Sequence, residues 1–121
     1  MRVVAMADTH LFHDELVVPD GDVDWAFNLP RGRALADKWA LIPEGIDVLV
    51  THGPPHGIGD RGPVAGRLGC EDLLARVKRV APRLHLFGHI HQDRGRWQHG
   101  PTLFANVTTW ECEQPVTVID L

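Results

Sequence analysis

Three short apolar segments, each followed by a polar loop, most constrain the fold of this chain. Their length and their β-branched content are typical of buried strands. They are RVVAMA (residues 2–7), IDVLV (46–50) and RLHLFG (83–88). A helical pattern separates the second segment from the third, and alternation of this kind favours an α/β fold.

The clearest helical pattern is CEDLLARVKRVAP, residues 70–82. It places acidic residues in the first turn and basic residues in the last, which suits the helix dipole. Its apolar face consists of Leu73, Leu74, Val77 and Val80. The segment RALADKWALIPEG, residues 33–45, predicts a shorter helix that ends before Pro43.

The C-terminal part of the chain carries a hairpin pattern. GRWQHGPTLFANVTT (residues 95–109) predicts two strands that turn at Gly100 and Pro101. PVTVIDL (115–121) predicts a last strand with alternating apolar residues. We therefore expect one α/β domain over residues 1–121, with a mixed sheet, helices and a C-terminal β-hairpin.

The amino-acid composition of the chain indicates the class of protein and shows which partners are not expected. The chain has 121 residues, 44% of them hydrophobic and 23% charged, which is typical of a soluble domain. A net charge of −4 gives no electrostatic reason to expect nucleic-acid binding. No apolar run approaches the ~20 residues that span a bilayer, and no signal peptide is evident. With only two cysteines as well, we expect a cytoplasmic protein without a membrane partner.

Metal-binding residue types follow each of the three apolar segments. Asp8 and His10 follow the first, His52 the second, and His89 and His91 the third. In open α/β sheets, sites form beyond the carboxyl ends of the strands. Because side chains alternate along a strand, residues two apart at its end are expected to point the same way.

One carboxylate and four imidazoles suit a transition metal such as Mn, Fe or Zn. The chain has eight histidines and no tyrosine, and the histidines are not evenly spread. A single histidine of this kind is more often a surface or hydrogen-bonded residue. Five residues that can act as ligands, at three successive strand ends, instead indicate a site for one or two divalent metal ions.

The same residues carry a family resemblance. DTH (residues 8–10), THGPP (51–55) and GHIH (88–91) resemble the motifs of the calcineurin-like metallophosphoesterases. The stretch from FNLPRG (27–32) to GHIH resembles the MPPED-like branch of that superfamily, whose members hydrolyse phosphodiesters. The resemblance covers nearly the whole chain and implies a shortened metallophosphoesterase-like α/β sandwich.

The resemblance also implies roles for the five residues. Asp8, His10 and His91 match ligands of a first metal, and His52 and His89 match ligands of a second. It implies a metal-dependent phosphodiesterase in which a metal-bound hydroxide attacks phosphorus. The expected substrate is a small phosphodiester, with a nucleotide as one candidate.

Two motifs of the family are missing, as if an internal deletion had removed them. They are a Gly-Asp pair, whose Asp bridges the metals, and a Gly-Asn-His motif, whose His assists the leaving group. The alternative function is therefore a catalytically impaired metal-binding or regulatory remnant. Residues near the junction that offer replacement ligands are His13, Asp14, Asp20, Asp22, Asp24 and Asn28.

Two residues are candidates for catalysis beside the metal ligands. His13 is a candidate to replace the missing leaving-group acid, with a solvated loop histidine as the alternative. Arg31 is a candidate donor to a phosphate oxygen, with a solvated loop arginine as the alternative.

Loss of internal strands is expected to expose sheet edges and apolar surface. We expect a homodimer or higher oligomer to cover them, which a strict monomer in light scattering would contradict.

Overall fold

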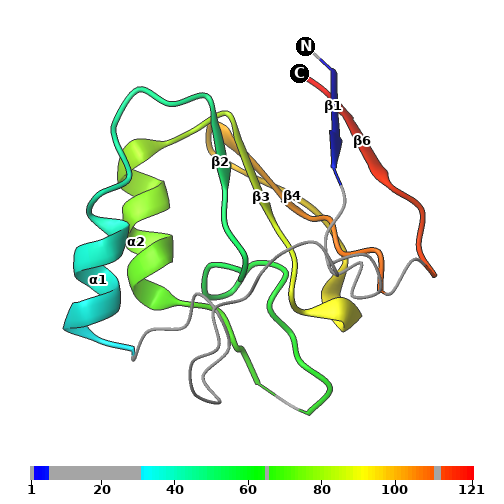
Figure 1. The fold of residues 1–121 in the computed structure, drawn as a ribbon, viewed down its shortest axis with the longest axis horizontal. Coiled ribbons are helices and arrows are strands. Elements are labelled where there is room, and N and C mark those ends of the chain that lie inside the picture. Colours follow the sequence, from blue (N-terminus) through cyan, green and yellow to red (C-terminus); the bar gives the residue numbers. More distant parts are fainter. Residues whose placement is uncertain (1, 6–30, 65, 111–112) are drawn as a thin grey trace, which may run out of the picture.

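The computed structural model describes residues 2–5, 31–64, 66–110 and 113–121 of the chain (Figure 1). In chain order the elements are β1 (Arg2–Ala5), α1 (Arg33–Trp39), β2 (Val48–Val50), α2 (Glu71–Val80), β3 (Leu84–Phe87), the 3-10 turn η1 (His91–Asp93), β4 (Gly95–His99), β5 (Thr102–Asn106) and β6 (Thr117–Asp120). The predicted alternation of strands and helices, the hairpin and the last strand are confirmed.

The larger sheet has four strands in the order β2-β3-β5-β4. β3 is parallel to both β2 and β5, whereas β4 is antiparallel to β5. The hairpin between β4 and β5 turns at Gly100 and Pro101, as its sequence predicts. The sheet is therefore mixed, and the carboxyl ends of β2, β3 and β5 meet at the edge near η1 (Figure 1).

β1 does not join this sheet among the described residues. It pairs antiparallel with β6, from Arg2 opposite Asp120 to Ala5 opposite Thr117. The sequence pattern grouped the first strand with the next two, because periodicity predicts that a strand exists but not which strand it pairs with. The observed architecture is a shortened α/β sandwich, with β1 and β6 as a separate pair (Figure 1).

Two cores lie on opposite faces of the four-stranded sheet. Alternate side chains of the strands divide between them, as the pleat requires. On the helical face, Leu49, Phe87 and Phe104 pack with Leu73 and Val77 of α2. The other face contributes Leu84, Leu86, Ala105 and Val107, which pack with Ile119 of β6.

α2 has the ends that its sequence predicts. Glu71 and Asp72 lie in its first turn, and Lys78 and Arg79 lie in its last. After Val80 the chain takes a left-handed conformation at Ala81 (φ 49°), whose N–H donates to the carbonyl of Val77, and Pro82 follows. The helix thus ends by a capping bond before the proline.

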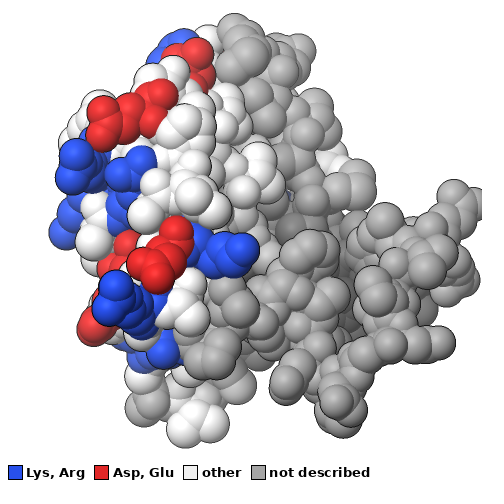
Figure 2. All heavy atoms as spheres, turned by 60° about the vertical axis from the view of Figure 1, so that its left-hand side comes forward, with Lys and Arg blue, Asp and Glu red and all other residues white. Residues whose placement is uncertain are grey.

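Charged side chains of both signs mix on the surface formed by α1 and α2 (Figure 2). Two ion pairs lie there, between Arg79 and Glu44 (3.2 Å) and between Arg33 and Asp37 (3.9 Å). This part of the surface carries no field of a single sign. In the described part of the chain, no helix has both the length and the apolar character needed to cross a membrane.

β2 lies at one end of the four-stranded sheet. Among the described strands it pairs only with β3, and its last residue, Val50, is 69% exposed. A strand edge with an exposed apolar side chain is what a shortened chain is expected to present. Its pairing with a second copy stays a prediction.

Candidate metal centre

Hydrogen bonds between β2 and β3 continue past the ends of both strands. The N–H of Thr51 donates to the carbonyl of Leu86 (3.0 Å), and the N–H of Gly88 donates to the carbonyl of His52 (2.9 Å). His52 is therefore held opposite Gly88, one residue before His89. The extended ladder brings the two histidines together although they lie 37 residues apart in the chain.

The two rings face each other at hydrogen-bonding distance. Nε2 of His52 lies 3.1 Å from Nδ1 of His89. The ring centroids are 4.7 Å apart and the ring planes are inclined by 53°. Both side chains are exposed, so a ligand from solution can reach them.

His89 is not on the strand, contrary to the alternation argument from sequence. β3 ends at Phe87, and His89 has a left-handed backbone with φ of 70°. The N–H of Ile90 donates to the carbonyl of Gly88 (2.8 Å), which closes a three-residue turn around His89. The turn, and not strand alternation, directs the His89 ring. A non-glycine residue in this conformation costs free energy and needs support from its surroundings.

His91 begins η1 and is half-buried. Its ring centroid lies 6.0 Å from that of Trp110, which is 40% exposed. Trp110 was not predicted at the site, because nothing in its own segment marks it.

Asp8, His10 and His13 lie outside the described residues, and within those residues no group of three or more His, Cys, Asp or Glu is arranged to hold a metal.

The His52–His89 pair fits one shared divalent ion. Two nitrogens about 2.1 Å from an ion, at the roughly 90–110° angles of octahedral or tetrahedral coordination, lie about 3.0–3.4 Å apart. The observed separation of 3.1 Å falls within that range. Imidazole nitrogens are also donors that Mn, Fe and Zn accept. The assignment of these residues as ligands nevertheless stays a prediction.

Arg31 contacts the loop between β2 and α2. Its guanidinium donates to the carbonyl of Gly69 (2.8 Å) and to the carbonyl of Leu68. In this arrangement Arg31 ties the segment before α1 to the end of that loop. Its proposed contact with a phosphate stays a prediction.

A buried histidine lies behind the exposed pair. His85 of β3 is fully buried beside Phe87 and Phe104, and its Nε2 lies 2.9 Å from Oγ1 of Thr51. The Thr51 hydroxyl donates its one proton to the carbonyl of Gly53 (2.8 Å), so Nε2 of His85 carries the proton that Thr51 accepts. The His85 ring thereby fixes the residue that precedes His52.

His85 is expected to make folding stability depend on pH. Burial lowers the pKa of His85 from 6.5 to about 3, and its Nδ1 has no partner among the described residues. Because the unfolded chain binds this proton below pH 6.5, the contribution is full above pH 6.5 and is lost as pH falls toward 3. Between pH 6.5 and pH 3, the unfolding free energy of the protein should therefore fall relative to that of His85→Gln, by up to about 1.4 kcal/mol per pH unit. Urea unfolding at several pH values measures this, and NMR protonation of His85 near neutral pH would contradict it.

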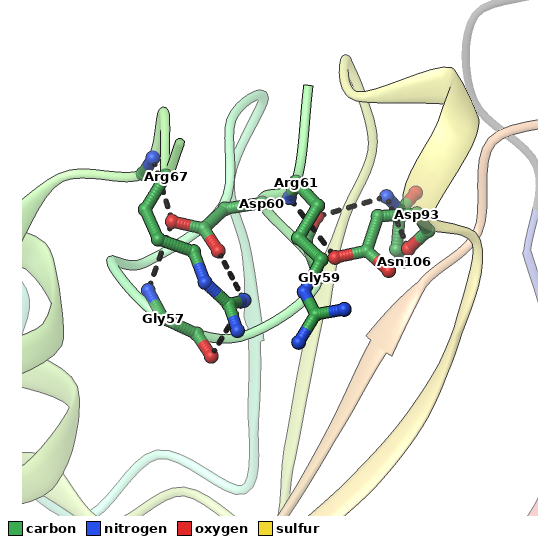
Figure 3. A network of polar contacts seen from close by, with 8 residues as sticks. Gly57, Gly59, Asp60, Arg61, Arg67, Asp93 and Asn106 are labelled. Atoms are coloured by element: carbon green, nitrogen blue, oxygen red, sulfur yellow. Dashed lines mark hydrogen bonds and ion pairs between the residues drawn. The ribbon is translucent and has the colours of Figure 1, made fainter. Parts of the chain in front are cut away.

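The loop between β2 and α2 folds around a buried carboxylate (Figure 3). Asp60 is fully buried, and it accepts the N–H groups of Gly57 and Gly69, each at 2.9 Å. Nη1 of Arg67 donates to the other oxygen at 2.9 Å. Gly69 also leaves no room for a side chain, because a Cβ there would lie 2.2 Å from the carbonyl oxygen of Pro55. We call Gly57, Asp60, Arg67 and Gly69 the Asp60 clamp.

Sequence reasoning missed the residues that hold the histidine loops. His85 and Asn106 are polar residues inside otherwise apolar strands, LHLF and TLFAN, and this contrast is a signal for a buried hydrogen-bonding role. Asp60 lies in a glycine-rich loop without such a pattern. Its role depends on bonds to residues up to nine positions away, which spacing alone does not predict.

Several known proteins are similar to this chain. No family model matches the chain. It is similar to metallophosphoesterase domain-containing protein 1 of Homo sapiens and of Mus musculus, each 50% identical over 103 residues that cover 80% of this chain and 32% of the relative. A UPF0046 protein of Caenorhabditis elegans is 55% identical over 84 residues, covering 69% of this chain and 21% of that protein. The chain thus spans about a third or less of the length of these curated relatives.

Proposed function

This chain belongs to the metallophosphoesterase family, and we propose that it is a metal-dependent phosphodiesterase. The observation that carries the proposal is the pair of imidazole nitrogens 3.1 Å apart, where the carboxyl ends of β2 and β3 meet. The pair is exposed, it lies at the edge where open α/β sheets bind ligands, and it offers donors that suit divalent metals.

In this proposal His52 and His89 hold one ion, and His91 holds a second with Asp8 and His10. Ions held there would supply Lewis-acid stabilisation of a phosphoryl oxygen and a water nucleophile at neutral pH. The backbone of the chain positions the two histidines. The extended β2–β3 ladder fixes His52, and the turn at Gly88–Ile90 fixes His89. His13, or a water molecule, donates a proton to the leaving oxygen as its bond to phosphorus breaks.

Trp110 would form an apolar side of the proposed site. Its ring lies beside that of His91 and is partly exposed. An aromatic surface of this kind suits a phosphodiester with an aryl or nucleoside group, and bis(p-nitrophenyl) phosphate is therefore a suitable first substrate.

The test combines a metal count with a rate. The purified protein, produced with Mn, Fe and Zn available, is analysed for metal per chain. Hydrolysis of bis(p-nitrophenyl) phosphate is then measured after chelation and again after Mn is restored. We expect at least one ion per chain and turnover that chelation removes and Mn restores.

Two other outcomes decide against the proposal. Stoichiometric metal without turnover supports the alternative, a metal-binding or regulatory remnant of a metallophosphoesterase. A chain that binds none of the three metals contradicts both functions, since each requires the histidines to act as ligands.

A further inference from the structure

Asn106, the last residue of β5, is a buried hydrogen-bonding centre. It is 1% exposed, and its Nδ2 lies within hydrogen-bonding distance of the carbonyl oxygens of Ile90 (2.7 Å), Asp93 (3.1 Å) and Gly59 (3.2 Å). Its Oδ1 accepts the N–H of Thr108 (3.2 Å). Because every partner of the nitrogen is an acceptor and the partner of the oxygen is a donor, the orientation of the amide is determined.

The partners of Asn106 lie on two loops that are distant in sequence (Figure 3). Gly59 belongs to the loop after β2, which contains His52. Ile90 and Asp93 belong to the loop after β3, which carries His89 and His91. A second bond joins the same two loops, from the N–H of Arg61 to Oδ2 of Asp93 (3.0 Å).

Ile90 lies between His89 and His91 in the chain, so its position affects the geometry of both histidines. Its N–H closes the strained turn around His89, and its carbonyl accepts the shortest of the Asn106 bonds. A left-handed non-glycine residue persists only where neighbouring contacts fix it. The bond from Asn106 to Ile90 is a contact of this kind, made from the end of a core strand.

We propose that Asn106 is a positioning residue that sets the placement of His89 and His91 relative to His52. Its consequence for metal binding rests on the proposed function, whereas its effect on the loop does not. An amide is required because two N–H bonds are shared among three carbonyls. An aspartate of the same size would instead place an oxygen against those carbonyls.

The experiment compares Asn106→Ala and Asn106→Asp with Val77→Ala. Val77 is fully buried in α2 and packs in the core between α2 and the sheet, so its variant loses core packing without touching either loop. Asn106→Ser, which keeps one donor, replaces any Asn106 variant that does not fold. Urea unfolding establishes that each variant is folded under the conditions of the assays.

Two readouts are measured on the folded proteins. The first is amide hydrogen exchange of Ile90 and Asp93 in metal-free protein, expected to be at least about tenfold faster in both Asn106 variants than in Val77→Ala. The second is Mn²⁺ affinity, followed through the free-ion EPR signal, which is expected to fall about 10–100-fold in both Asn106 variants and to stay unchanged in Val77→Ala.

The pattern of results separates the two proposals. If Asn106→Asp matches the unmodified protein in both readouts, the amide donors are not needed and the inference fails. If exchange stays slow in the Asn106 variants, Asn106 does not hold the loop and the inference fails as well. If the unmodified protein binds no Mn²⁺, the proposed function fails on that metal, while hydrogen exchange still decides the role of Asn106.

Discussion

Replacing Asp60 with alanine is expected to lower the free energy of unfolding by about 2–4 kcal/mol. The substitution removes a buried carboxylate that accepts the N–H groups of Gly57 and Gly69 and a bond from Arg67. The Gly69 N–H is buried and would lose its acceptor, whereas Gly57 and the partly exposed Arg67 can turn to water. The cost is therefore smaller than three full hydrogen bonds to a charged group, and urea unfolding measures it.

Asp37→Ala is the matched control for this experiment. Asp37 also pairs with an arginine, Arg33, at 3.9 Å, but its side chain is 74% exposed. Surface pairs of this kind contribute about 0.5 kcal/mol or less. If Asp60→Ala costs no more than Asp37→Ala, the Asp60 clamp does not stabilise the fold.

The same carboxylate is expected to contribute to acid sensitivity. Burial raises the pKa of Asp60, but hydrogen bonds from Gly57, Arg67 and Gly69 and the charge of Arg67 outweigh this and hold it below the ordinary 3.8. A lowered folded-state pKa stabilises the fold above pH 3.8, and this is lost as pH falls through the folded-state value. The stability difference between the protein and Asp60→Asn should therefore shrink below about pH 4. Both proteins contain His85, so its titration cancels in the difference.

Patterns local in sequence predicted the elements of this fold well. The apolar spacing and end charges of residues 70–82 predicted α2, and the Gly100–Pro101 turn predicted the hairpin of β4 and β5. The partner of β1 was not predictable in the same way. Its pairing with β6 joins residues near the two ends of the chain, and no spacing rule connects them.

The candidate site was likewise predicted only in part from the sequence. Sequence pointed to His52 and His89 because ligand residues follow apolar strands, and the parallel ladder of β2 and β3 does bring them together. It did not predict the left-handed turn at His89 or the bonds that support it from Asn106. Those features depend on which loops meet in space, and this meeting is a property of the whole sheet.

Replacing either His52 or His89 with alanine is expected to lower kcat/KM for Mn-dependent hydrolysis more than about 100-fold, because loss of a partner outside the coordination sphere already costs about 10–100-fold. The two nitrogens are 3.1 Å apart, so each variant would leave only the other histidine of the pair to hold the proposed ion. His99→Ala is the matched control, since His99 is an exposed histidine in β4, at the hairpin end of the sheet. Equal activity in His99→Ala and the protein is expected.

His89→Gly separates the ligand from the backbone that carries it. Alanine at φ of 70° keeps the strain of the turn, whereas glycine adopts this conformation freely. His89→Gly is therefore expected to be more stable than His89→Ala by roughly 1 kcal/mol and yet equally inactive. If His89→Gly regains activity, the imidazole is not a ligand and the strained turn alone explains the alanine variant. If activity stays lost while stability rises, the left-handed backbone at His89 costs stability, and its role is to position the imidazole ring that activity requires.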